Sequence, residues 1–280
     1  MTGGRCAEIS EAAGEPLGAT ATTARSWLLI ESVGTWPRDV SDAPTLDEPD
    51  RAAVRAWLES TPTGRLLYIR RPGRRRGSRA VFVVRAAERQ TEVRRLDAHA
   101  SLAEVDLARD GEVVDAQLVL VCGHGSRDAC CALRGTAVYG ALESRLGEDE
   151  LWLSSHQGGH RFAANVLLLP QGIQLGRVAP TRAGTLLDAA LAGTIDLTHY
   201  RGRTAYTQRE QAGERLVREA NGILELADLR LIGDDGEFVR FVDVSGVEHR
   251  VVVDECDGPT LPASCGVPPA PQKVLTARAA

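Results

Sequence analysis

The chain of 280 residues lacks several features that would assign it to a common class of protein. No apolar run approaches the roughly 18 residues that a membrane-spanning helix needs. Residues 1–23 have no apolar core segment of the kind that signal peptides contain. The net charge is −5, so the basic excess of a nucleic-acid-binding domain is also missing. We therefore predict a globular protein that binds neither membrane nor nucleic acid.

Several enzyme motifs are missing as well. The cysteines do not form the CxxC spacing that thiol-disulfide exchange commonly uses. The segment LIGDDGEF (residues 231–238) has two glycines, but it leads into a predicted strand rather than the helix of a nucleotide-binding fingerprint. Acidic residues are scattered, without the paired carboxylates of a glycoside hydrolase. We therefore do not predict a glycoside hydrolase, a thiol-disulfide oxidoreductase or a nucleotide-binding enzyme from these motifs.

What the chain does contain is a concentration of soft metal ligands. Three of the six cysteines and three of the six histidines fall between residues 116 and 165: Cys122, Cys130, Cys131, His124, His156 and His160. Such clustering fits a metal or cofactor site in a reducing compartment better than a disulfide framework. We therefore predict a cytoplasmic protein with one inorganic centre.

The first ligand segment has a strand-loop-helix pattern. The apolar residues QLVLV predict a buried strand that ends at Cys122. After a short loop, apolar residues recur at helical spacing from residue 129 and end at Gly147, a typical C-terminal glycine. Cys130 and Cys131 would then lie near a helix N-terminus, where free amides and the helix dipole favour a thiolate. Asp128 could cap this helix.

The second ligand segment is predicted as a loop between two strands. LWLS (residues 151–154) and AANVLLL (residues 163–169) read as strands, and the loop between them contains His156, Gly158, Gly159 and His160. Two thiolates and two imidazoles suit either tetrahedral zinc or a two-iron cluster with mixed ligands. Structural zinc usually takes ligands two to four residues apart, so the long interval between the cysteines favours the cluster.

Three stretches together resemble the sucrase/ferredoxin-like family: CGHGSRDACC, SSHQGGHRFAANVLLLPQG and SWLLIESVGTWPRD. The resemblance covers roughly residues 25–195 and implies a thioredoxin-like ferredoxin with a 2Fe-2S cluster. Carried over to this sequence, it implies that the cluster ligands are Cys122, Cys131, His156 and His160. Cys130 competes with Cys131, because this chain has two adjacent cysteines where the family has one. Six neighbours are expected to surround the ligands: His124, Arg127, Asp128, Gly158, Gly159 and Arg161.

The resemblance also implies a function. Imidazoles carry less negative charge than thiolates, so such a cluster has a raised potential, about −150 to +300 mV in Rieske centres. We therefore predict an electron-transfer protein that carries one electron between unidentified donor and acceptor proteins. We expect such a carrier or redox component rather than a stand-alone enzyme, and we do not predict sucrase activity. The alternative is a structural or binding module in which the same four residues hold zinc without redox chemistry.

We predict an α/β protein with five segments. They are a disordered tail (1–23), an N-terminal α/β domain (24–112), the thioredoxin-like cluster domain (113–195), a helix with a small β-meander (196–262) and a loose tail (263–280). Cys6 lies in the first tail, and we discount it as a ligand. Cys256 and Cys265 are nine residues apart, but no histidine pair follows, so we predict no second metal site there.

A run of arginines is the remaining feature. It comprises Arg65, Arg70, Arg71, Arg74, Arg75, Arg76 and Arg79, around a predicted hairpin. We favour a solvated hairpin loop, and the alternative is a docking surface for an acidic redox partner.

Overall fold

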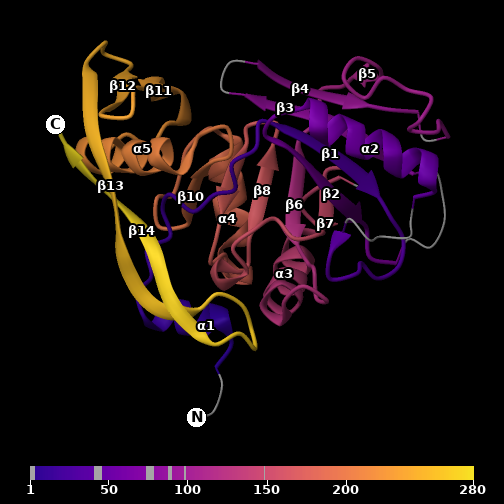
Figure 1. Ribbon diagram of the computed structural model, residues 1–280, viewed down its shortest axis with the longest axis horizontal. Helices are drawn as coiled ribbons and strands as arrows, with labels where there is room; N and C mark the ends of the chain where they lie inside the picture. Colours follow the sequence, from indigo (N-terminus) through magenta and orange to yellow (C-terminus); the bar gives the residue numbers. More distant parts are fainter. Residues whose placement is uncertain (1–3, 41–45, 74–78, 88–89, 98, 148) are drawn as a thin grey trace.

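A computed structural model describes residues 4–40, 46–73, 79–87, 90–97, 99–147 and 149–280. Its main feature is a curled sheet of ten strands in the order β10-β9-β8-β6-β7-β2-β1-β3-β4-β5 (Figure 1). The first five strands are β1 (Ser26–Glu31), β2 (Gly64–Arg70), β3 (Val81–Ala87), β4 (Gln90–Arg95) and β5 (Glu112–Val113). The others are β6 (Leu118–Cys122), β7 (Leu151–Ser154), β8 (Val166–Leu169), β9 (Ile173–Leu175) and β10 (Tyr200–Arg203). The protein is therefore of mixed α/β class, as predicted.

The central strands are apolar along their whole length because both faces of the sheet are buried. In β6, Leu118 and Leu120 belong to one hydrophobic cluster, and Val119 and Val121 belong to another. A strand with one solvated face would instead alternate apolar and polar residues. The short runs QLVLV and SWLLIE are thus strands with a core on each side.

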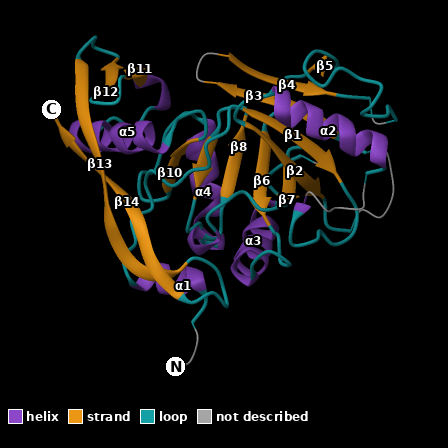
Figure 2. Cartoon of the chain, in the orientation of Figure 1, coloured by secondary structure: helices purple, strands orange, loops and turns teal. Residues whose placement is uncertain are grey.

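Helices cover one of these faces (Figure 2). They are α2 (Glu48–Ser60), α3 (Ala129–Leu142) and α4 (Pro180–Leu191). Trp57 of α2, Val138 of α3 and Leu186 of α4 all join the cluster that contains Val119. The helix α3 ends five residues before Gly147, which we had predicted as its C-terminal glycine. The cluster on the other face includes Trp27 and Trp152 from the strands themselves.

A second, antiparallel sheet of four strands is built from the C-terminal part of the chain. Its strands are β11 (Leu229–Asp234), β12 (Val239–Asp243), β13 (Glu248–Pro262) and β14 (Pro269–Ala279), in sequence order. Helix α5 (Gln208–Asn221) packs on it through a third cluster around Phe241. The hairpin of β13 and β14 runs on beyond this sheet to the N-terminal helix α1 (Cys6–Ala12), as Figure 1 shows. Within the described residues there are also two 3-10 helices, η2 (His160–Phe162) and η3 (Leu226–Asp228).

Both predicted tails were wrong. Residues 4–23 include α1, in which Cys6 and Ser10 are buried. The segment after residue 262 forms a tip and then β14, whose pairing with β13 satisfies its backbone groups. Composition misled us in both places, because contacts with distant parts of the chain hold these segments. The boundary at residue 112 stays a prediction, and β2 pairs with β7 across it within the single large sheet.

Where the arginine run is described, its side chains contact residues that are distant along the chain. Arg70 stacks on Trp36 at 4.2 Å, Arg71 forms an ion pair with Asp149 at 3.0 Å, and Arg79 does so with Asp50 at 3.2 Å. Burial lowers the pKa of Arg65. Residues 74–78, with three of the seven arginines, lie outside the described residues.

Candidate metal centre

Parallel pairing of β6 with β7 places the two ligand loops at one edge of the sheet. Cys122 ends β6 and pairs with Ser154, which ends β7. Because parallel strands point the same way, the loops that follow them leave the sheet side by side. His156 in the second loop therefore lies beside Cys122, although 34 residues separate them.

Helix α3 brings Cys131 to the same edge. Its N-cap is Asp128, whose carboxylate accepts a hydrogen bond from the N–H of Cys130 at 2.8 Å. Such a side-chain cap satisfies one of the free amides at a helix start. Cys131 follows in the first turn and is fully buried.

Cys122, Cys131 and His156 form a compact group. One ligand atom from each lies within 4.8 Å of the other two, and His156 Nδ1 is 4.0 Å from the Sγ of each cysteine. His160 continues the row, since its Nδ1 lies 3.3 Å from His156 Nε2. The four residues that the resemblance pointed to thus lie next to one another, in the order sulfur pair, His156, His160. We call these four residues the Cys2His2 group.

Hydrogen bonds fix which nitrogen of each imidazole carries the proton. His160 Nε2 donates to the backbone oxygen of Ala263, so its Nδ1 is left as an acceptor facing His156. His124 Nε2 donates to the backbone oxygen of Pro37 at 2.8 Å, and its Nδ1 accepts the N–H of His156 at 3.1 Å. Burial lowers the pKa of both His124 and His160. Both rings are therefore neutral near pH 7, the form in which histidine binds metals.

The two cysteines influence each other's acidity. The hydrogen bond between their sulfurs lowers the pKa of Cys122 and raises that of Cys131. Cys122 is thus the more acidic thiol of the pair. Both are buried, whereas His156 and His160 are half-buried, so the imidazole end of the group faces the surface.

Glycines allow the second loop to turn tightly over the group. Gly158 and Gly159 have φ of +92° and +68°, a region that residues with a Cβ rarely adopt. A methyl group at Gly158 would come within 2.5 Å of the Thr22 hydroxyl oxygen. The loop is also held by Arg201, which donates to the Gly158 backbone oxygen at 3.1 Å.

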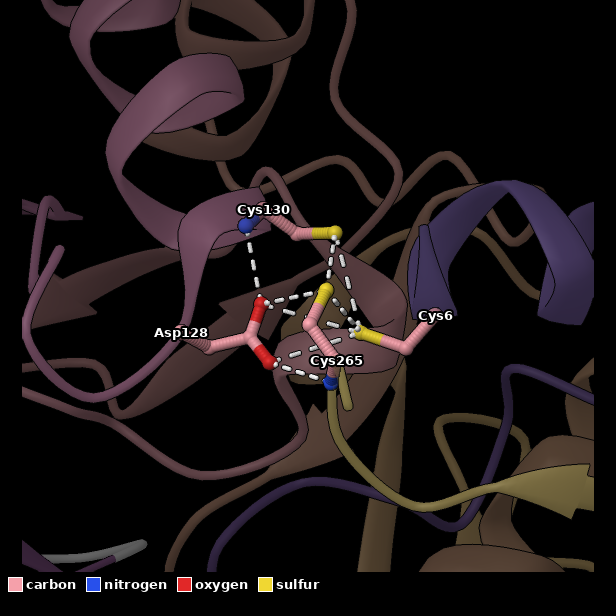
Figure 3. Close-up of side chains that lie close together, drawn as sticks. All are labelled: Cys6, Asp128, Cys130 and Cys265. Carbon is pink, nitrogen blue, oxygen red and sulfur yellow. Dashed lines mark hydrogen bonds between the residues drawn. The ribbon is translucent and has the colours of Figure 1, made fainter. Parts of the chain in front are cut away.

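The other predicted neighbours lie farther along the same loops. Arg161 forms an ion pair with Glu15 at 2.7 Å, and Arg127 is half-buried at the end of the first loop. Asp128 and Cys130 point into a different group, together with Cys6 and Cys265 (Figure 3). The alternative assignment of Cys130 to the Cys2His2 group is therefore disfavoured, because its sulfur faces the other group.

Sequence reasoning missed Cys6 and Cys265. One was set aside as part of a disordered tail, and the other was considered only with Cys256. Cys256 lies apart from both groups, with its sulfur 3.6 Å from the backbone oxygen of Val274. The one signal in the sequence for this second group was Cys6, a cysteine in a segment of otherwise small and polar residues.

The profile of the family described as sucrase/ferredoxin-like matches residues 17–202. The chain belongs to the sucrase/ferredoxin-like family. The matched region contains all of the Cys2His2 group, and it ends before the β13–β14 hairpin.

Similar curated proteins come from yeasts and carry the name "Altered inheritance of mitochondria protein 32". The Eremothecium gossypii protein is 34% identical over 110 residues, which cover 34% of this chain and 35% of the relative. The Meyerozyma guilliermondii protein is 32% identical over 96 residues, covering 31% and 34%. The chain thus spans only about a third of the length of the relatives it matches. No solved structure gives a significant match. Among the described residues, none of the helices is both long and apolar enough to cross a membrane.

Proposed function

We propose that this protein carries one electron on a 2Fe-2S cluster held by Cys122, Cys131, His156 and His160. The observation that carries this proposal is the meeting of two cysteines and two histidines from separate segments. The sulfurs lie at one end, His160 lies at the other, and His156 lies between them. A mixed-ligand 2Fe-2S cluster takes two thiolates on one iron and two imidazoles on the other, which is this set of four side chains.

The position of His160 favours a cluster over a single ion. Around one tetrahedral zinc, all four ligand atoms would lie roughly 3.3–3.8 Å apart, given metal bonds of about 2.0–2.3 Å. The group of atoms within 4.8 Å of one another includes Cys122, Cys131 and His156 but leaves out His160. His156 turns Nδ1 to the sulfurs and Nε2 to His160 Nδ1 at 3.3 Å, so it would use Nε2 to share one iron with His160. A zinc ion bound by all four residues would require His160 to move closer to the sulfurs.

When bound, the cluster would supply one-electron chemistry, and the residues around it determine how the electron leaves. The buried cysteines keep water from the sulfur end, while the half-buried histidines face the surface. The hydrogen bond from His160 to Ala263 keeps the proton on the outer nitrogen. We propose that donor and acceptor proteins, still unidentified, approach the histidine end.

Two further features belong to the same proposal. The first is a thioredoxin-like cluster domain at residues 113–195. Its succession of strand, ligand loop and helix, with the helix packed on a mixed sheet, is compatible with that fold. The second is location in a reducing compartment such as the cytoplasm, which the clustered free cysteines support.

The experiment that tests the proposal is iron and sulfide analysis with EPR on anaerobically purified protein. We expect two irons and two sulfides per chain, and an EPR signal on reduction. Cys131→Ser and His156→Ala should lose the iron, whereas Cys130→Ser and Cys256→Ser should keep it. The proposal fails if iron is absent from the wild type, or if zinc is present and is lost on Cys122→Ser.

A further inference from the structure

Three cysteines from distant parts of the chain meet beside Asp128, apart from the Cys2His2 group. Cys6 comes from α1, Cys130 from the first turn of α3, and Cys265 from the tip of the β13–β14 hairpin (Figure 3). Their sulfurs form a nearly equilateral triangle with sides of 3.6, 3.5 and 3.6 Å. We call Cys6, Cys130, Cys265 and Asp128 the Cys3Asp group.

We propose that the Cys3Asp group binds one zinc ion. Thiolates bound to a single tetrahedral zinc lie about 3.8 Å apart, since the Zn–S bond is about 2.3 Å. The observed triangle is within about 0.3 Å of this spacing. It is too wide for a disulfide, in which the sulfurs are about 2.05 Å apart. All three cysteines are free.

Asp128 completes a set of four ligand atoms. Its Oδ1 lies 3.4 Å from the sulfur of Cys265 and 3.7 Å from that of Cys6. An oxygen and a sulfur on one tetrahedral zinc lie about 3.5 Å apart, given a Zn–O bond of about 2.0–2.2 Å. All four ligand atoms lie within 4.8 Å of one another. In contrast to the Cys2His2 group, these four atoms have the spacing of a site for one ion.

The Asp128 carboxylate is held in place from both sides. Its Oδ1 accepts the N–H of Cys130 at 2.8 Å, and its Oδ2 accepts the N–H of Cys265 at 2.8 Å and the hydroxyl of Ser264 at 2.9 Å. Hydrogen bonds of this kind orient metal ligands in known sites. Two of the three donors are the backbone N–H groups of Cys130 and Cys265, which are ligands of the same group.

The ion would connect three segments that are separated along the chain. Cys6 and Cys265 are 259 residues apart, and Cys130 is 124 residues from Cys6. The hairpin tip that carries Cys265 also carries Ala263, the acceptor for His160. A zinc ion at this position would hold the N-terminal helix and the hairpin tip against the start of helix α3, next to Cys131 of the Cys2His2 group.

The test is zinc analysis of the full chain, with variants that separate the two groups. We expect one zinc per chain in the wild type, its loss in Cys6→Ser and Cys265→Ser, and its retention in Cys256→Ser. Cys122→Ser should keep the zinc even if it loses iron. The two proposals are thus distinguished, because each predicts loss of a different metal from a different variant.

A second measurement keeps the proposal testable if the serine variants fail to fold. Co²⁺ is titrated into metal-free Cys122→Ser/Cys131→Ser protein, in which the other group lacks its sulfurs. We expect one equivalent of Co²⁺ to give intense sulfur-to-cobalt absorption that one equivalent of Zn²⁺ removes. Adding a chelator to the wild type should make the hairpin tip more sensitive to protease.

Three results would overturn the inference. One is the absence of zinc from protein purified anaerobically from zinc-supplemented cells, together with no thiolate absorption on adding Co²⁺. Another is unchanged zinc content in folded Cys6→Ser and Cys265→Ser variants. The third is a disulfide among the three cysteines in freshly purified protein, detected by mass after alkylation.

Discussion

Gly135 of α3 lies directly against the backbone oxygen of Cys122. A methyl group built on Gly135 would be 2.0 Å from that oxygen, which is far inside van der Waals contact. This approach lets α3 pack closely on the end of β6 and brings Cys131 to Cys122. Replacing Gly135 should therefore disturb both packing and the Cys2His2 group.

We predict that Gly135→Ala lowers the free energy of unfolding by about 1–3 kcal/mol and reduces the iron content, because the helix must move away from Cys122. Gly140 of the same helix has open space around its Cα, so Gly140→Ala is the matched control. It should stabilise the protein by about 0.5–1 kcal/mol, since alanine is the better helix former. Urea denaturation measures both changes, and equal effects of the two substitutions would contradict this account.

His124 supports the second ligand loop, and His124→Phe tests this role. Phenylalanine can keep the edge contact with Trp36, whose ring centre is 5.7 Å from that of His124. It cannot accept the N–H of His156 or donate to Pro37. We expect a loss of about 1–3 kcal/mol in unfolding free energy and faster release of iron to a chelator. If the variant released iron at the wild-type rate, His124 would contribute only packing and its hydrogen bonds would have no role in holding the loop.

Arg201 also supports the second ligand loop, through contacts separate from those of His124. Its buried guanidinium donates to the Gly158 backbone oxygen, to Asn165 Oδ1 at 2.9 Å and to Thr20 Oγ1 at 3.0 Å. A lysine cannot span these acceptors, so Arg201→Lys should cost about 2 kcal/mol or more. Arg230 on β11 is exposed, and Arg230→Lys should change stability by less than about 0.5 kcal/mol. Thermal unfolding of the two variants checks the difference.

Asp50 should make stability depend on pH. Burial by itself would raise its pKa, but hydrogen bonds from Ser101, Arg79 and the N–H of Leu102 outweigh burial and lower the pKa. A carboxyl group whose pKa is lower in the folded state stabilises the protein above its unfolded pKa of about 3.9, and that contribution is lost as pH falls through the lower folded value.

We therefore expect Asp50→Asn to be less stable than the wild type by about 1–3 kcal/mol at pH 7. The difference should shrink as pH falls below about 4, when the wild-type carboxyl group is also protonated. Asp188→Asn, at an exposed carboxyl group on α4, is the control and should show little change at any pH. Urea denaturation between pH 2.5 and 7 is the measurement. A difference that is constant over this range would rule out the carboxylate as its cause.

Local pattern predicted the elements of the large sheet well. The runs SWLLIES, GRLLYIRR and QLVLV became β1, β2 and β6, and DRAAVRAWLEST became most of α2. Short apolar runs identify such elements because hydrophobicity and strand length act within a few residues. The order of the strands was not predictable, since β2 pairs with β7 about 85 residues later.

The sequence by itself determined that Cys122 would end a strand and that both histidines would follow one, because an apolar run precedes each ligand loop. Only the tertiary structure decided that Cys131 rather than Cys130 joins Cys122, because helix α3 turns adjacent residues about 100° apart. The meeting of Cys6 with Cys265 was likewise a matter of tertiary structure. Their contact spans 259 residues and depends on a hairpin reaching an N-terminal helix, which no local pattern encodes.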